Sequence, residues 1–248
     1  GLALLQAAGI ETASGLLENE ARELNIGFVS RMTRGRPWLR LKVAASLDGK
    51  TALNNGVSQW ITGSDARRDG HAWRARACAI LTGIGTVRDD DPQLLVRDVE
   101  TTRQPLRVVV DSRFEIPLTA RILQGGPVLL VGAVENAEKI QMLRSAGNFV
   151  EILKNPAGKV DLKALLELLA QRGINEVHAE AGFKLNGSLM REGLVDELLL
   201  YLAPCLIGHD ASGLFNLPEL TTLDDRRRLQ IRDLRQVGED IRLIARLR

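Results

Sequence analysis

The segment from Ile174 to Leu199, INEVHAEAGFKLNGSLMREGLVDELL, decides the fold and locates its candidate site. It predicts a strand that ends at Glu180, a tight turn at Gly182 and a helix that begins near Phe183. Such a helix start presents several backbone N–H groups without intrahelical partners, which favours an anion there. The Glu180 carboxylate would lie beside these donors and could accept hydrogen bonds from a polar ring or a sugar. An ordinary strand-to-helix turn explains the segment equally well, so the rest of the chain must decide.

Composition restricts the class of protein. The chain has 248 residues, 45% of them hydrophobic, which is enough for a sizeable core in one large domain or two small ones. Its 33 Lys and Arg nearly balance its 31 Asp and Glu, so we expect no nucleic-acid partner and only a local site for any phosphate. Cys78 and Cys205 lie in apolar runs, which argues against a disulfide scaffold. No apolar run is long enough to cross a bilayer and no basic leader is present, so we expect a cytoplasmic protein with no membrane partner.

Residues 1–36 differ in pattern from the rest of the chain. Apolar residues at helical spacing run from Leu16 to Phe28, and the basic patch RMTRGRP follows, which is typical of a linker. The chain also begins without a methionine. We therefore expect this segment to be the tail of a neighbouring domain.

From Pro37 onward, strand patterns alternate with helix patterns. Trp38 to Ser46 alternates apolar and basic residues, which predicts a strand whose Lys42 faces away from the apolar side. We expect further strands at 78–82, 106–111, 127–131, 150–153, 174–180 and 197–203, an antiparallel pair at 229–235 and 241–248, and helices at 64–76, 136–146, 161–172 and from 183, the first capped by Ser64. The order indicates an α/β fold with a mixed, mostly parallel sheet flanked by helices and an antiparallel C-terminal strand pair.

Two predicted loops contain candidate ligand contacts. The segment 46–64, rich in Gly, Asn and Ser, predicts a long polar loop that lines a pocket. The GIGT sequence at 83–86 lacks the rest of a GxGxxG fingerprint, and an acidic run with Pro92 follows where a crossover helix should begin. The acidic run is typical of a solvated turn, but it could also contact ribose hydroxyls or cap a short helix. Thr86 and Asp90 are the candidates within residues 83–92.

Metal-dependent chemistry is not indicated. His178-Ala-Glu180 matches the HxE half of the zinc deaminase motif, but the P-C-x-x-C pair that completes the metal site is absent. The chain has only three histidines and two cysteines, so we expect no other transition-metal site. It also lacks a G-x-S-x-G elbow and a Walker loop, which argues against a hydrolase or an NTPase.

Polar residues instead gather at predicted strand ends and in the long loop. Open α/β sheets bind ligands at the carboxyl ends of their strands. The candidates are Lys42, Ser58, Trp60, Arg74, Thr86, Asp90, Arg97, Ser112 and Glu180.

Six ordered motifs together resemble one family, the reductase domain of bacterial bifunctional riboflavin-biosynthesis proteins, which is similar to dihydrofolate reductase in fold. The motifs are LKVAASLDGK at 41–50, SQWIT at 58–62, Thr86 with DDP at 90–92, VDS at 110–112, EAG at 180–182, and GLVDE at 193–197 with Ala203-Pro204. The resemblance covers residues 37–248. Residues 1–36 resemble the end of that family's deaminase domain, whose metal-binding part is missing from this chain.

The resemblance implies NADPH-dependent reduction of 5-amino-6-(5-phosphoribosylamino)uracil to 5-amino-6-(5-phosphoribitylamino)uracil. The implied substrate contacts are Ser58, Arg74, Leu94, Arg97 and Glu180. The implied cofactor contacts are Ala44, Trp60, Thr86, Asp90, Ser112, Gly182, Phe183, Lys184, Leu185, Asn186, Gly187 and Ser188. We expect Arg74 and Arg97 to hold the substrate phosphate bidentately, and the helix start at Gly182 to take the cofactor's pyrophosphate.

The catalytic assignment stays a hypothesis at this stage. Lys42 could protonate the sugar oxygen as the ring opens while Glu180 orients the uracil, or Lys42 could simply be solvated. Ala181 and Lys184 depart from the family pattern, which often has glycine or a small residue there. A pterin- or folate-type NADPH reductase and a non-catalytic nucleotide-binding module remain as alternatives. The apolar run 197–203 and the resemblance favour a homodimer.

Overall fold

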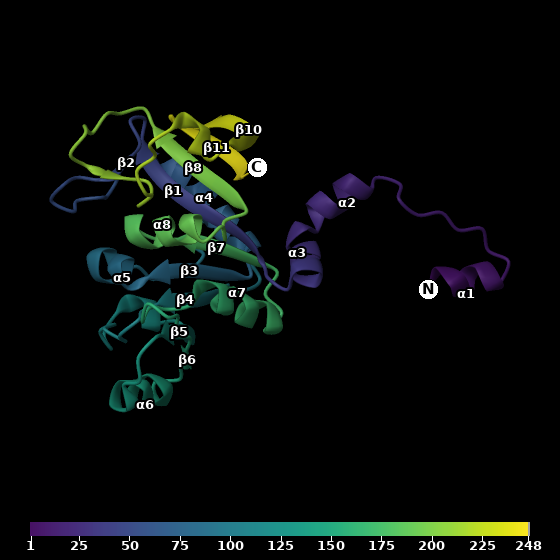
Figure 1. Cartoon of the computed structure of the whole chain (residues 1–248), viewed down its shortest axis with the longest axis horizontal. Helices are drawn as coiled ribbons and strands as arrows, with labels where there is room; N and C mark the ends of the chain where they lie inside the picture. The colour runs from purple at the N-terminus through teal and green to yellow at the C-terminus, as the bar shows by residue number, and fades with distance from the viewer. Residues whose placement is uncertain (248) are drawn as a thin grey trace.

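A computed structural model describes residues 1–247 as a series of strands and helices (Figure 1). The helices are α1 (Leu2–Ala7), α2 (Glu18–Leu24), α3 (Ile26–Arg34), α4 (Ser64–Arg76), α5 (Ile84–Asp90), α6 (Ala137–Ser145), α7 (Leu162–Gln171) and α8 (Phe183–Arg191). The strands are β1 (Trp38–Ser46), β2 (Lys50–Ala52), β3 (Ala79–Gly83), β4 (Leu106–Val110), β5 (Val128–Gly132), β6 (Phe149–Ile152), β7 (Glu176–Glu180), β8 (Glu197–Ala203), β9 (Ser212–Gly213), β10 (Leu229–Val237) and β11 (Asp240–Leu247). Every strand and helix expected from the sequence is present, with ends shifted by a few residues.

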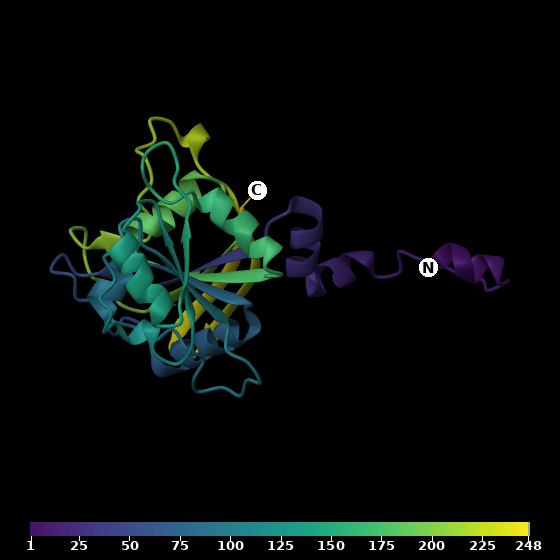
Figure 2. The ribbon, with the colours of Figure 1, turned by 90° about the horizontal axis from the view of Figure 1, so that it is seen from below.

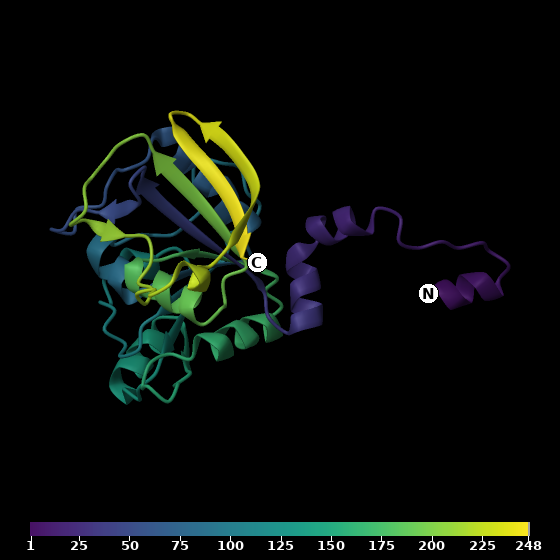
Figure 3. The ribbon, with the colours of Figure 1, turned by 45° about the horizontal axis from the view of Figure 1, so that its top comes forward.

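Nine strands form one sheet in the order β10-β11-β8-β1-β7-β3-β4-β5-β6. The pairs from β8 to β6 are all parallel, whereas β11 pairs antiparallel with both β8 and β10. Figure 3 shows this antiparallel hairpin, in yellow, at one edge of the sheet. The expected mixed, mostly parallel α/β fold is confirmed.

Helices cover both faces of the sheet (Figure 2). One core cluster joins α7 and α8 to side chains of the central strands, with Leu41, Leu165 and Leu189 fully buried. On the other face, α5 and α6 cover the β3–β6 half, and α4 covers β8 and β11. Because both faces are covered, the central parallel strands are apolar along most of their length.

Helix caps follow the sequence at two helices and not at a third. The Asp161 side chain accepts from the Ala164 N–H at 2.9 Å, and Asn136 accepts from the Lys139 N–H at 3.1 Å. The expectation that Ser64 caps α4 is wrong, because Ser64 is the first helical residue and Gly63 stands at the cap position. The Gly63 N–H donates instead to Asp240 at 2.8 Å, which ties α4 to the C-terminal hairpin.

Two expectations about loops are corrected. The segment 46–64 is not loop throughout, because its β2 part pairs antiparallel with β9. A helix does begin here, within the GIGT sequence: α5 runs from Ile84 to Asp90, and Asp91 ends it in the left-handed conformation at φ 40°. No helix within residues 1–247 is long and apolar enough to cross a membrane.

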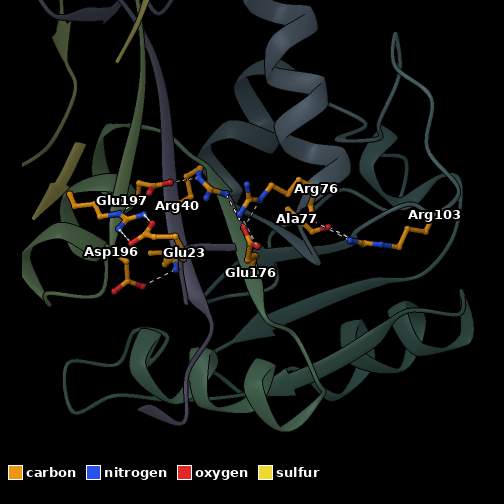
Figure 4. Close-up of polar contacts among 10 residues, drawn as sticks. Glu23, Arg40, Arg76, Ala77, Arg103, Glu176, Asp196 and Glu197 are labelled. Atoms are coloured by element: carbon orange, nitrogen blue, oxygen red, sulfur yellow. Dashed lines mark hydrogen bonds and ion pairs between the residues drawn. The ribbon is translucent and has the colours of Figure 1, made fainter. Parts of the chain in front are cut away.

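The basic residues of β1 do not face water. Arg40 is 2% exposed, because α4 and the hairpin cover the face of β1 on which its basic residues lie. Its Nε donates to Glu197 at 2.6 Å and its Nη1 to Glu176 at 3.1 Å. Figure 4 shows Arg40 between these two carboxylates. The ring of Trp73, on α4, covers the Arg40 guanidinium, which lies 4.3 Å from the ring centre.

This charged cluster lies at the amino ends of the strands, since Glu176 and Glu197 are the first residues of β7 and β8. It continues outward through Arg246, which donates to Glu197 at 3.1 Å and to both oxygens of Glu23 at 2.7 Å. Removing one member of a buried pair leaves an uncompensated charge, which costs about 3–5 kcal/mol. The buried arginine therefore helps to hold three strands in register.

The N-terminal segment is joined to the sheet through Glu23 of α2, which pairs with Arg246 of β11, and through residues near its far end. Helices α1 and α2 contribute no buried residue, and Figure 1 shows α1 well away from the sheet. Arg34 and Arg36 both donate to Asp196, at 2.7 and 2.8 Å, and Asp196 also accepts from the Leu39 N–H at 2.8 Å. These contacts fix the chain where β1 begins.

Candidate active site

The carboxyl end of β7, the middle of β1 and the last turn of α4 bring together three charged side chains that are distant in sequence. The register pairs Lys42 with Glu180, and Glu180 is the last residue of β7, as expected. Arg74, from the last turn of α4, donates to both oxygens of Glu180, the Nη2 contact being 2.9 Å. Lys42 Nζ lies 3.6 Å from Oε2 of the same carboxylate. A bidentate arginine pair with a second cation therefore surrounds one carboxylate.

The cations determine the charge of Glu180. Burial acts to raise the pKa of Glu180, but the Arg74 guanidinium and the Lys42 ammonium outweigh it, so the pKa lies well below the usual range. His178 lies two residues earlier on β7, fully buried, with its Nε2 3.4 Å from Glu180. Burial lowers the pKa of His178, and its imidazole is neutral. His178 is thus a buried histidine of strand β7, and the expectation that it lies in a strand is confirmed.

The segment from Leu94 to Asp98 approaches this cluster from beyond α5. Leu94 is buried, with φ of 50°, and the Arg74 Nη1 donates to the Leu95 carbonyl at 3.3 Å. Within residues 1–247 the exposed Arg97 guanidinium has no hydrogen-bond or ion-pair partner. Arg74, by contrast, uses all its guanidinium nitrogens on Glu180 and Leu95, which leaves no free fork for the phosphate grip expected of it.

A second group of candidates meets where the 46–64 segment touches α5. The Ser58 hydroxyl and the Gln59 amide both donate to Asp90 at 3.2 Å. The Trp60 ring is 70% exposed, and Arg67 stacks on it with its guanidinium 4.7 Å from the ring centre. The resemblance implies that Ser58 contacts the substrate and Asp90 the cofactor. In this structure the two side chains are hydrogen-bonded to each other.

The start of α8 has the shape expected of an anion site. Gly182 stands at the N-cap, and Gly182, Phe183 and Lys184 are exposed. A Cβ on Gly182 would lie 3.7 Å from the Thr86 hydroxyl, so α5 and α8 meet here. The first N–H groups of a helix have no intrahelical acceptor and favour negative charge.

Later residues of α8 have packing roles. Asn186 is buried, and Leu185 packs against the central core. A Cβ on Gly187 would come within 2.3 Å of the Asn216 carbonyl, so only glycine fits beneath the 205–228 segment. Ser188 donates to the Lys184 carbonyl at 3.2 Å. The exposed residues 182–184 are therefore better placed to contact a ligand than residues 185–188.

The remaining candidates lie along the same edge of the sheet. Ala44 is half-buried near the end of β1, and Ser112 follows the end of β4, where its carbonyl accepts from the Ala133 N–H at 2.9 Å. The parallel pairing of β1, β7, β3 and β4 sends all these carboxyl ends to one side.

Comparison with known proteins decides the family. Residues 37–243 match the RibD C-terminal domain family. The chain belongs to this family. It is 42% identical to the riboflavin biosynthesis protein RibD of Haemophilus influenzae, over 98% of this chain and 67% of that protein. It is 41% identical to the Escherichia coli K12 RibD, over 97% of this chain and 68% of that protein. The family expected from the six motifs is confirmed.

Solved RibD structures share the fold over the whole chain. Acinetobacter baumannii RibD superposes with a TM-score of 0.89 and 40% sequence identity, covering 100% of this chain and 68% of that one. A Thermotoga maritima deaminase and reductase, 23% identical, has a TM-score of 0.81 and supports the fold alone. The chain spans about two thirds of the length of each of these relatives.

Two supporting residues of this RibD-type site were not found from the sequence. His71 accepts from the Arg97 N–H at 3.0 Å, and Gln104 bonds the backbone of Val96 on both sides. The ion pair between Arg74 and Glu180, which are 106 residues apart, was also unforeseen. The only signal for His71 was its position one turn before Arg74 on the same helix face.

Replacing Glu180 by Gln tests the electrostatics of the site. A carboxylate whose folded-state pKa is lowered contributes stability that is fully present above its unfolded value of 4.5 and is lost as pH falls through the folded value. We expect E180Q to lose about 3 kcal/mol of unfolding free energy near pH 7, because Arg74 and Lys42 lose their partner. Its stability should then fall less steeply than that of wild type below about pH 4.5.

Urea unfolding at a series of pH values measures both quantities. Glu219→Gln, in an exposed loop, is the matched control and should follow wild type throughout. Parallel acid slopes for wild type and E180Q would contradict the charged, cation-held state of Glu180.

Proposed function

We propose that this chain reduces the ribosyl group of 5-amino-6-(5-phosphoribosylamino)uracil to the ribityl group with NADPH. By family, the chain is a reductase domain of riboflavin biosynthesis. The observation that carries the proposal is the Glu180 carboxylate, held ionised by Arg74 and Lys42 at the carboxyl ends of the strands. Open α/β sheets bind their ligands at that edge.

Glu180 orients the uracil. An ionised carboxylate has about four lone-pair positions, and the two hydrogen bonds to Glu180 both come from Arg74. The other positions are approached by His178 Nε2 at 3.4 Å and by Lys42 Nζ at 3.6 Å, longer contacts that we expect the ring N–H groups of the substrate to replace. Because the backbone of β7 and the Arg74 fork hold the carboxylate, its direction is set before the substrate binds.

Arg97 takes the substrate phosphate. Its guanidinium is exposed and uncommitted within residues 1–247, and it follows the buried anchors Leu94 and Val96. Arginine binds phosphate through two parallel N–H donors. Arg74 then acts by orienting Glu180 and by holding the Leu95 carbonyl, in place of gripping the phosphate itself.

NADPH fits the groups at the start of α8. The backbone N–H groups of the exposed residues 182–184 suit its pyrophosphate, and the Thr86 hydroxyl lies beside Gly182. The exposed Lys184 adds positive charge at the same place. Ala44, Trp60, Asp90 and Ser112, along the same edge, are the proposed contacts for the rest of the cofactor. NADPH supplies the hydride, and the protein supplies orientation and a proton path.

Lys42 is the proposed proton donor to the sugar ring oxygen. Its side chain is only 23% exposed, and its ammonium lies beside the carboxylate that orients the uracil. A solvated lysine would show neither feature. Donation by a positioned acid assists opening of the ribosylamine ring, which the reduction requires.

Residues 1–36 are proposed to be the end of a deaminase domain. The RibD relatives are about half as long again as this chain, and the alignment covers nearly all of it. Helices α1 and α2 contribute no residue to the reductase core, whereas residues 34–36 are bound to Asp196. The reductase domain would therefore begin at residue 37.

The proposed function is tested by NADPH absorbance after addition of the phosphoribosylaminouracil substrate, with NADH and a pterin substrate as comparisons. We expect oxidation with the ribitylamino product, and a Lys42→Met variant with turnover lowered at least about 100-fold while its NADPH affinity changes little. Lys163→Met, an exposed residue of α7, is the control with wild-type turnover. Tight NADPH binding without oxidation in wild type would indicate a nucleotide-binding module, and wild-type turnover in Lys42→Met would remove its catalytic role.

The chain is also proposed to form a homodimer, but not through the segment first suspected. The apolar run 197–203 is β8, an internal strand whose side chains are largely buried. The edge strand β10 instead exposes Leu229, Ile231 and Leu234, the last two being 60% and 62% exposed. An edge strand with exposed apolar side chains is suited to pairing with a second copy.

Light scattering tests the dimer. Wild type should have twice the mass of the chain, and Ile231→Glu should shift it toward monomer because a charge enters the apolar contact. Met142→Glu, on α6 beside the opposite edge strand, should leave the mass unchanged. A monomeric wild type, or a dimer that Ile231→Glu does not weaken, would contradict the proposal.

A further inference from the structure

His71 is a buried histidine that no step of the proposed reaction uses. It lies on α4, one turn before Arg74, and is 7% exposed. Its Nδ1 accepts from the backbone N–H of Arg97 at 3.0 Å, and its Nε2 lies 3.6 Å from the Asp98 carboxylate. A buried polar ring with both nitrogens directed at one short segment indicates a positional role.

That segment is held residue by residue. Arg74 donates to the Leu95 carbonyl, Gln104 accepts from the Val96 N–H at 2.8 Å and donates to its carbonyl at 3.2 Å, and His71 binds the Arg97 N–H. The flanking residues Leu94 and Asp98 have φ of 50° and 61°. Non-glycine residues in the left-handed region cost of order 1–3 kcal/mol each and persist only where surrounding contacts fix them.

We propose that neutral His71 is a positioning residue that fixes the backbone at Arg97, and with it the guanidinium that binds the substrate phosphate. The inference rests on the proposed function, which gives Arg97 its ligand. Of the three side chains that hold the segment, only His71 binds Arg97 itself. Only His71 also changes its donor pattern with pH in the physiological range.

Protonation removes the contact for a simple reason. When Nδ1 accepts from Arg97, the neutral ring carries its proton on Nε2, facing Asp98. A second proton on Nδ1 would point at the Arg97 N–H, so two donors would face each other. Acidification should therefore release the segment.

The groups around His71 act in both directions. Burial and the cations Arg74 and Arg97 lower the pKa of His71, whereas Asp98 and Glu180 raise it, and the net direction is downward. The neutral form is thus the resident form near neutral pH. Its contribution to stability is complete above the unfolded value of 6.5 and is lost as pH falls through the lower folded value.

Two variants separate the hydrogen bond from the packing. Asn places an amide oxygen near the Nδ1 position and does not titrate, so H71N retains the acceptor at every pH. Leu has a similar bulk and no acceptor, so H71L loses the contact. We expect H71L to raise KM for the phosphoribosylaminouracil substrate about three- to tenfold at about pH 8, with kcat and NADPH affinity near wild type. H71N should stay near the wild-type KM.

The pH profile gives a second readout. As pH falls from about 8 through the folded pKa of His71, which lies below 6.5, the KM of wild type should rise more steeply than that of H71N, because only wild type loses the Nδ1 acceptor. The substrate phosphate itself titrates near pH 6, but it does so equally with both proteins. Identical profiles for wild type and H71N, or an unchanged KM in H71L, would overturn the inference.

Hydrogen exchange measures the effect of His71 on residues 94–98 independently of enzyme activity. Mass spectrometry of peptides covering residues 94–98 should show faster exchange in H71L than in wild type or H71N, whether or not any substrate is turned over. An absence of turnover in wild type with this exchange pattern would refute the proposed function alone. Faster exchange with an unchanged KM would show a packing role for His71 and refute its part in phosphate binding.

Discussion

The parallel pairing of β1 with β7 is the constraint on which the rest of the structure depends. Its register sets Lys42 opposite Glu180 at the carboxyl end of β7 and Arg40 opposite His178 nearer the amino ends. Side chains alternate along a strand, so a slip of one residue would turn every one of them to the other face. The register is stabilised by the pair between Arg40 and Glu176 of β7, while Arg40 also pairs with Glu197 of β8. The same register builds the ligand-binding edge.

Much of the fold could be predicted from local patterns. Short β-branched runs, glycine stops and side-chain caps such as Asp161 are signals within a few residues of the element they define. The alternation of β1 could not show whether its basic face is solvated, because alternation reports only polarity, and a buried arginine with two carboxylate partners has the same pattern as an exposed one. The cap at Ser64 was wrong by one position, because Asp240, far along the chain, supplies the acceptor.

The sequence predicted several residues of the candidate site, but not which of them contact each other. Lys42, Arg74 and Glu180 were all named from the sequence, yet no local signal tells which arginine pairs with the carboxylate and which stays free. That division depends on how α4 crosses the sheet, a property of packing. The hydrogen bonds that hold residues 94–98 could not be predicted for the same reason, because His71 reaches this segment from a different element, α4.

A crystal structure of the protein with NADP⁺ and the ribitylamino product tests the central claim most directly. The account predicts that the uracil donates hydrogen bonds to Glu180, the nicotinamide lies against the ribityl chain beside Lys42, the product phosphate binds Arg97, and the pyrophosphate lies at the start of α8. Ligands bound at another edge of the sheet, or a uracil that does not touch Glu180, would contradict it.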